Sequence, residues 1–250
     1  MSSLPMKSGN PVLSEDVFSQ WAAADRRATV MTIEGTAGKA LILLAILVGT
    51  AAIAWNQAHE ASPATPFLMF GGLIGGLILA LVTTFKPTWS PVTAPMYAAC
   101  EGLVLGSISA FFNAKYQGIV AEAVGLTFGV MFLMLAIYVT RLIRVTPKLA
   151  AAIMAATGAV CLVYLATWIL GFFGVAIPYI HQGGAIGIGF SLFVVGIAAF
   201  NLLLDFDMIE RGAASEAPKF MEWYGAFGLM VTLVWLYLEI LRLLSKLRDR

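Results

Sequence analysis

Apolar residues form seven long runs along the chain, separated by short polar segments. Each run is close to the ~20 residues that a helix needs to cross a bilayer, and none alternates as a membrane barrel strand does. The pattern predicts an all-α polytopic membrane protein, a bundle of seven transmembrane helices. The expected spans are residues 38–58, 65–85, 93–113, 117–140, 149–174, 184–209 and 222–245.

The runs divide the chain into three parts. Residues 1–36 are polar and form an N-terminal arm, in which Ser14 could cap a short helix that lays Trp21 on the membrane surface. A loosely ordered cytosolic tail is the alternative for this arm. Residues 37–247 form the membrane domain, and residues 248–250 form a basic tail.

Composition agrees with a membrane protein. Of the 250 residues, 60% are hydrophobic and 12% are charged, whereas a soluble domain carries about 25% charged residues. The net charge of +1 gives no reason to expect a nucleic-acid partner. Cys100 and Cys161 lie in apolar runs without a second cysteine nearby, so neither a disulfide framework nor a zinc site is expected.

The distribution of Lys and Arg predicts the orientation, because cytoplasmic links carry most of these residues. With the N-terminus in the cytoplasm, the outer links hold only Lys115, and the tail after the last run is the exception. Either the last run crosses the membrane or it re-enters and returns; residues 222–245 are long enough to cross. The cytoplasmic side would carry Lys7, Arg26, Arg27, Lys39, Lys86, Arg141, Arg144, Lys148, Arg211 and Lys219.

An acidic residue in the sixth run is the main functional candidate. Asp205 shares a helical stripe with small and polar residues, which predicts that it faces the bundle interior. A carboxylate at bilayer depth costs a few kcal/mol and indicates function by default, although a structural acid is the alternative. Asp207 lies about 200° around the helix, and an ion pair with Arg211 is expected there. The stripe consists of Gly187, Ser191, Val194, Ala198, Asn201 and Asp205.

A second stripe, in the last run, contains Glu239. One hypothesis is that Asp205 and Glu239 meet and share a proton, because two carboxylates in contact cannot both ionise cheaply. Such a pair would respond to pH and, when ionised, would suit Ca²⁺ as a permeating or bound ion. The alternative is a structural pair between Glu239 and Arg242. The stripe consists of Gly228, Thr232, Trp235, Glu239, Arg242 and Lys246.

The starting point of the last helix decides between these alternatives. If the helix begins at Met221, Glu239 lies ~27 Å along it and Asp205 only ~9 Å above the link, so the acids miss each other. They meet if the spanning part begins near Gly225 to Gly228, with residues 214–224 along the membrane surface.

Three further charged residues are secondary candidates. Glu101 and Glu122 either line a water-filled path or bond to helix ends. Lys86 could supply a basic group at the inner mouth of such a path, or it could extend to the headgroups as lysines near helix ends do.

Four stretches together resemble the bacterial Bax inhibitor-1-like membrane proteins. The resemblance implies a seven-helix bundle with the last helix central, located in the bacterial inner membrane. It also implies a pH-sensitive Ca²⁺ leak gated by paired acids on the sixth and seventh helices, at Asp205 and at Glu239, where an aspartate is more usual. The stretches are Asn10-Pro11-Val12-Leu13, Glu101-Gly102-x-x-x-Gly106-x-x-Ser109, Asn201 to Ile209, and Leu236-Tyr237-Leu238-Glu239-Ile240-Leu241.

Other functions are also considered. The chain could be a membrane interaction protein that modulates a membrane protease or another membrane complex through its arm and tail. A proton-coupled carrier would also use buried acids. An enzyme is not expected, because His59 and His181 fall in outer links and Ser191 lacks a Gly-x-Ser-x-Gly setting. No cofactor is expected; the predicted partners are the lipid bilayer, Ca²⁺, protons and a membrane protein.

Overall fold

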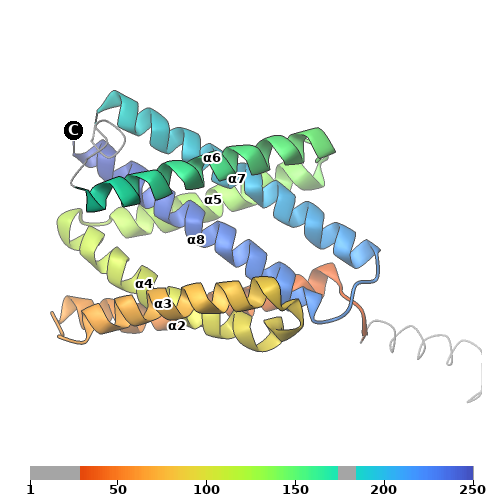
Figure 1. Ribbon diagram of the computed structural model, residues 1–250, viewed down its shortest axis with the longest axis horizontal. Helices are drawn as coiled ribbons and strands as arrows, with labels where there is room; N and C mark the ends of the chain where they lie inside the picture. Colours follow the sequence, from red (N-terminus) through yellow and green to blue (C-terminus); the bar gives the residue numbers. More distant parts are fainter. Residues whose placement is uncertain (1–28, 174–183, 250) are drawn as a thin grey trace, which may run out of the picture.

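The computed structural model describes residues 29–173 and 184–249, which fold into a bundle of helices (Figure 1). Seven helices in this part of the chain are long and apolar enough to cross a membrane, which confirms the predicted fold class. The predicted surface helix with Ser14 and Trp21 lies outside the described residues. The helices are α2 (Ile33–His59), α3 (Thr65–Phe85), α4 (Ser90–Lys115), α5 (Ile119–Val139), α6 (Pro147–Phe172), α7 (Ala185–Ala214) and α8 (Met221–Arg248), with a 3-10 turn, η2 (Pro87–Trp89), before α4.

Several helices extend beyond the apolar runs that predicted them. α2 begins at Ile33 because Thr32 caps it, with its side chain accepting a hydrogen bond from the Gly35 amide. α7 continues to Ala214 and α8 already begins at Met221. Residues 221–224 therefore belong to the last helix, and the surface segment that would have delayed its start is not formed. Polar side chains mark the end of an apolar run, but they do not end the helix, which can continue into the headgroup region.

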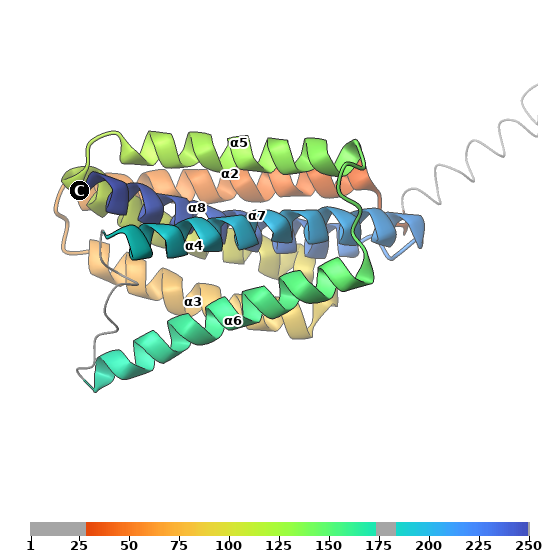
Figure 2. The same cartoon turned by 90° about the horizontal axis from the view of Figure 1, so that it is seen from above.

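α8 occupies the centre of the bundle (Figures 1 and 2). It packs against α2, α4, α5 and α7, and it is the most buried of the seven spans. Leu236 and Leu241 are almost completely inaccessible to solvent, at 0% and 1% exposure. This arrangement confirms that the last helix is central.

Hydrogen bonds fix the start of α8 to the start of α2. The Glu222 side chain is fully buried, and its Oε1 accepts hydrogen bonds from the amide (2.9 Å) and the hydroxyl (2.8 Å) of Thr32. Lys39 and Lys219 both form ion pairs with the same carboxylate. We call this group the Glu222 cluster; it comprises Thr32, Lys39, Lys219 and Glu222.

The chain beside this cluster adds backbone pairing. The Met31 amide donates to the Ala217 carbonyl at 2.7 Å, and the Lys219 amide donates to the Thr29 carbonyl at 3.1 Å. Residues 29–31 are thus paired with the link that leads into α8.

The other end of α8 is held by the link between α4 and α5. Arg248 donates to the Gln117 carbonyl and to the Glu122 carboxylate, both at 2.7 Å. Asp249 accepts hydrogen bonds from Tyr116 and Lys115, and these contacts, that of Tyr116 first, hold the pKa of Asp249 below its usual value. We call the end of the bundle where α8 begins the N-terminal end, and the end where it stops the C-terminal end.

Close backbone contact joins α4 to α2. A Cβ atom added at Gly106 would lie 2.2 Å from the Ala51 carbonyl oxygen, and one added at Gly102 would lie 2.3 Å from the Leu47 carbonyl oxygen. Only glycine leaves room for this approach. By contrast, α6 packs mainly against α7, which it crosses in Figure 1, and it reaches α8 only through side chains such as Tyr164.

The glycine contact leads to a stability prediction. Gly106→Ala should lower the free energy of unfolding by about 1–3 kcal/mol, because the added methyl group cannot fit against a backbone carbonyl. Gly129→Ala is the matched control, since an added Cβ there has no atom within 4 Å. Thermal unfolding in detergent measures both. Equal melting temperatures for the two variants would contradict the close contact.

Candidate functional site

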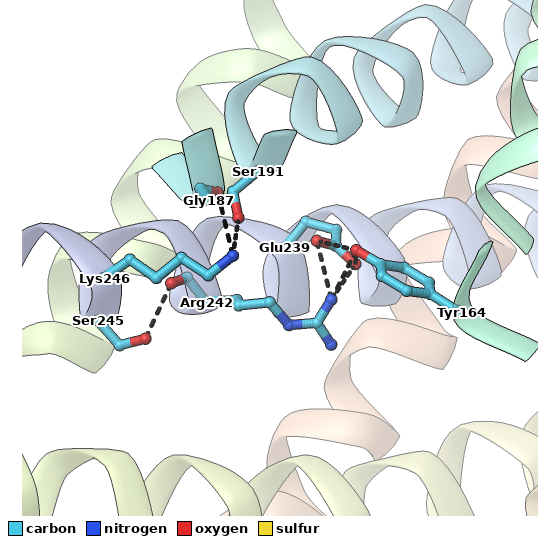
Figure 3. Close-up of polar contacts among 7 residues, drawn as sticks. All are labelled: Tyr164, Gly187, Ser191, Glu239, Arg242, Ser245 and Lys246. Carbon is cyan, nitrogen blue, oxygen red and sulfur yellow. Dashed lines mark hydrogen bonds and ion pairs between the residues drawn. The ribbon is translucent and has the colours of Figure 1, made fainter. Parts of the chain in front are cut away.

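The two stripes predicted from the sequence face each other across α7 and α8. Near the C-terminal end, the Lys246 ammonium donates to the Ser191 hydroxyl at 2.8 Å and to the Gly187 carbonyl at 3.1 Å (Figure 3). Toward the N-terminal end, Asp205 interacts with the Thr232 side chain. The predicted inward faces of both helices are therefore correct.

Glu239 lies in a closed group with two residues from α6 and α8 (Figure 3). Its side chain is 2% exposed. Tyr164 donates to both carboxylate oxygens at 3.0 Å, and Arg242 Nη1 donates to Oε1 at 2.9 Å. The same Arg242 nitrogen donates to the Tyr164 hydroxyl at 2.7 Å, and the guanidinium lies 4.9 Å from the ring centre. The charge of Glu239 is thus compensated by Arg242, as the structural alternative anticipated.

The Asp205 carboxylate has no such compensation. Its Oδ2 oxygen is buried and has no hydrogen-bond partner among residues 29–173 and 184–249. Its neighbour on the stripe, Asn201, turns toward α6 and donates to the Thr157 hydroxyl at 2.8 Å. An acidic oxygen left without a donor in a buried position is costly unless a proton or a cation occupies it.

Asp205 and Glu239 do not form the proton-sharing pair predicted as one alternative. The partner of Asp205 is Thr232, which precedes Glu239 by two helical turns, or ~10 Å. The reason is the start of α8 at Met221, which carries Glu239 past the level of Asp205. No three Asp, Glu, His or Cys side chains of the described residues come together as a metal site.

An apolar layer separates the two polar groups. Val160, Val194 and Ile197 form a buried cluster with Trp235 packed against it. Val194 and Ile197 lie between Ser191 and Asn201 along α7, and Trp235 lies between Thr232 and Glu239 along α8. We call the whole arrangement the α6–α7–α8 column. It consists of Asp205, Thr232, Asn201 and Thr157 toward one end, the apolar layer, and Tyr164, Glu239, Arg242, Ser191 and Lys246 toward the other.

A large chamber adjoins the column at the C-terminal end. Its volume is about 1150 Å³, and it lies among the ends of α2, α3, α4 and α8. Leu238, Leu241 and Arg242 line it from α8. Arg242 therefore lies between the chamber and Glu239.

The remaining predicted residues lie apart from the column. Asp207 forms the expected ion pair with Arg211, at 2.7 Å. Lys86 lies 4.8 Å from the centre of the Trp89 ring in the α3–α4 link. Glu101 interacts with Tyr97 on its own helix and faces Gly76 of α3. Glu122 forms the exposed ion pair with Arg248 at 2.7 Å.

Sequence reasoning missed two residues that hold this arrangement together. Tyr164 donates to Glu239, and Glu222 fixes the start of α8. A signal for Tyr164 was present, because it follows Thr157 by seven residues on the same face of an apolar helix. Glu222 had no comparable signal, since two of its three partner residues, Thr32 and Lys39, lie more than 180 positions away and only Lys219 is a neighbour in the chain.

Replacing Arg242 by an uncharged residue should destabilise the protein, because Glu239 would then be a buried charge without a counter-charge. We expect Arg242→Met to lower the free energy of unfolding by about 3 kcal/mol, because a buried carboxylate loses its counter-charge. Tyr164→Phe should cost about 1 kcal/mol, since it removes only a neutral donor. Adding Glu239→Gln to Arg242→Met should restore much of the loss in a thermal unfolding assay. No recovery in the double variant would show that the charge is not the cause.

Comparison with known proteins supplies the family. A search of curated proteins finds no match, and a search of solved structures finds none either. A family model described as Bax inhibitor 1 like matches residues 10–249, nearly the whole chain. With seven membrane-spanning helices, a central last helix and this match, the chain belongs to the Bax inhibitor 1-like family.

Proposed function

We propose that the protein is a pH-sensitive leak for Ca²⁺ and that the α6–α7–α8 column is the ion path. The observation that carries the proposal is the buried Oδ2 oxygen of Asp205, which has no hydrogen-bond partner among the described residues. Membership of the Bax inhibitor 1-like family supports the same function.

The chemistry of an intramembrane carboxylate explains the response to pH. Asp205 can be neutralised either by a proton or by a cation, because the free charge is unfavourable in the bundle. At low pH a proton fills this role. At higher pH the ionised oxygen offers a hard ligand, and Ca²⁺ prefers such oxygen ligands. Proton and Ca²⁺ therefore compete for one group.

The column also contains groups that could close the ion path. The apolar layer of Val160, Val194, Ile197 and Trp235 would exclude water and ions, as hydrophobic constrictions do in channels. On its far side Glu239 is paired with Arg242, next to the large chamber. In place of a carboxylate pair, we propose two acids with separate roles. Asp205 responds to pH, and Glu239 forms an ion pair with Arg242 that keeps the path closed.

Orientation completes the proposal. Lys and Arg are concentrated in the links at the N-terminal end of the bundle, which we therefore place in the cytoplasm of a bacterial inner membrane. The chamber would then open on the outer side, and Ca²⁺ would enter through it.

Flux measurements test the leak. In proteoliposomes loaded with a Ca²⁺-sensitive dye, the wild-type protein should pass Ca²⁺ several-fold faster at pH 8 than at pH 6. Asp205→Asn should pass Ca²⁺ slowly at both pH values, because an amide cannot ionise. The matched control is Asp207→Asn, whose carboxylate pairs with Arg211 at the helix end; it should retain the wild-type response.

Two results would contradict the proposal. An unchanged pH response in Asp205→Asn would show that another group senses protons. Loss of the response in Asp207→Asn would place the sensor at the helix end, outside the column.

A further inference from the structure

The guanidinium group of Arg242 borders the chamber at the C-terminal end, and only one of its nitrogens forms hydrogen bonds with the described part of the bundle. The hydrogen bonds of Arg242 with Tyr164 and Glu239 all involve one nitrogen, Nη1. Nε and Nη2 have no hydrogen-bond partner among the described residues. The side chain is 38% exposed, and Arg242 lines the chamber. One edge of the guanidinium is therefore available to a molecule in the chamber.

The geometry of this edge selects an oxyanion. Nε and one Nη of a guanidinium form two parallel donors, which match two oxygens of a phosphate or carboxylate group. Tyr164 and Glu239 hold the opposite edge, so the donors are oriented before a ligand arrives. Preorganisation of this kind lowers the entropic cost of binding.

The chamber walls add polar groups and an apolar surface. The Thr65 hydroxyl oxygen is buried and lacks a hydrogen-bond partner in the described part of the chain, and Thr65 lines the chamber with His59 and Asn113. Asn113 accepts a hydrogen bond from the Gly118 amide through Oδ1, which leaves its amide nitrogen as a donor. Phe70 and Phe111, which also line the chamber, are 56% and 70% exposed.

From these groups, we infer that the chamber is a binding site for a phosphate group, held by the free edge of Arg242. The volume of about 1150 Å³ exceeds what an inorganic ion needs. The phosphate can therefore belong to inorganic phosphate or to the headgroup of an anionic phospholipid whose chains lie against Phe70 and Phe111. The inference does not rest on the proposed ion path, because its test needs no Ca²⁺ flux. A bound phosphate would lie beside Arg242, at the outer entrance of that path.

Calorimetric titration in a non-ionic detergent tests the site. The probes are inorganic phosphate, monomeric dihexanoyl phosphatidic acid and, as the comparison without a phosphate group, dihexanoylglycerol. Saturable binding of inorganic phosphate and of phosphatidic acid would identify phosphate alone as sufficient. Binding of phosphatidic acid only would identify a lipid headgroup. If neither phosphate probe binds, or if dihexanoylglycerol binds as tightly as phosphatidic acid, the inference is wrong.

Variants locate the binding. Arg242→Gln should weaken phosphatidic acid binding about 10- to 100-fold, the effect of losing charged hydrogen bonds, and Arg242→Lys should recover only part of it, because an ammonium lacks the planar fork. Arg144→Gln is the matched control, since Arg144 is an exposed arginine at the opposite end of the bundle and does not line the chamber. It should bind as the wild type does.

A second variant covers the case in which Arg242→Gln fails to fold. Ala114→Trp fills the chamber from its exposed α4 wall and leaves the Tyr164–Glu239–Arg242 contacts in place. We expect it to abolish binding without lowering the melting temperature. Wild-type affinity in Ala114→Trp or Arg242→Gln would overturn the site.

Discussion

The buried carboxylate of Glu222 sets the geometry on which the rest of the bundle depends. Two lysines and the N-cap residue of α2 converge on it, so displacing the first turn of α8 would take this carboxylate away from four donor groups. Breaking such a buried ion pair typically costs 3–5 kcal/mol. Because a helix rises ~1.5 Å per residue, the position of Met221 determines the depth of every later side chain. The level of Thr232, Glu239 and Lys246 therefore follows from a contact at the opposite end of the helix.

This dependence explains which features the sequence could predict. The apolar runs predict seven helices because the bilayer requires a minimum length of apolar chain. Helical periodicity also predicts which faces of α7 and α8 turn inward, and Ser191, Asp205 and Glu239 all lie on those faces. Both properties are local, since they depend only on neighbouring residues in the chain.

The register between α7 and α8 is not local, and the sequence left it open. Asp205 lies level with Thr232 instead of Glu239. The reason is that the link between the helices is short and that the Glu222 cluster fixes the start of α8 at Met221. Apart from Lys219, the partners of Glu222 lie in residues 32–39, far from α8 in sequence. Only the assembled bundle shows that they meet, and this contact decides between the two starting points of the last helix that the sequence left open, Met221 and Gly225 to Gly228.

The attachment of α8 at both of its ends limits how this bundle can change shape. Glu222 anchors one terminus to α2, and Arg248 anchors the other to the link that begins α5. These contacts oppose both a sliding of α8 along its axis and a displacement of its ends, more strongly at the buried Glu222 than at the exposed Arg248. α6 is held less firmly, because it packs mainly against α7 and reaches α8 only through side chains. A displacement of α6 away from the column would have to break the contacts of Tyr164 with Glu239 and of Thr157 with Asn201.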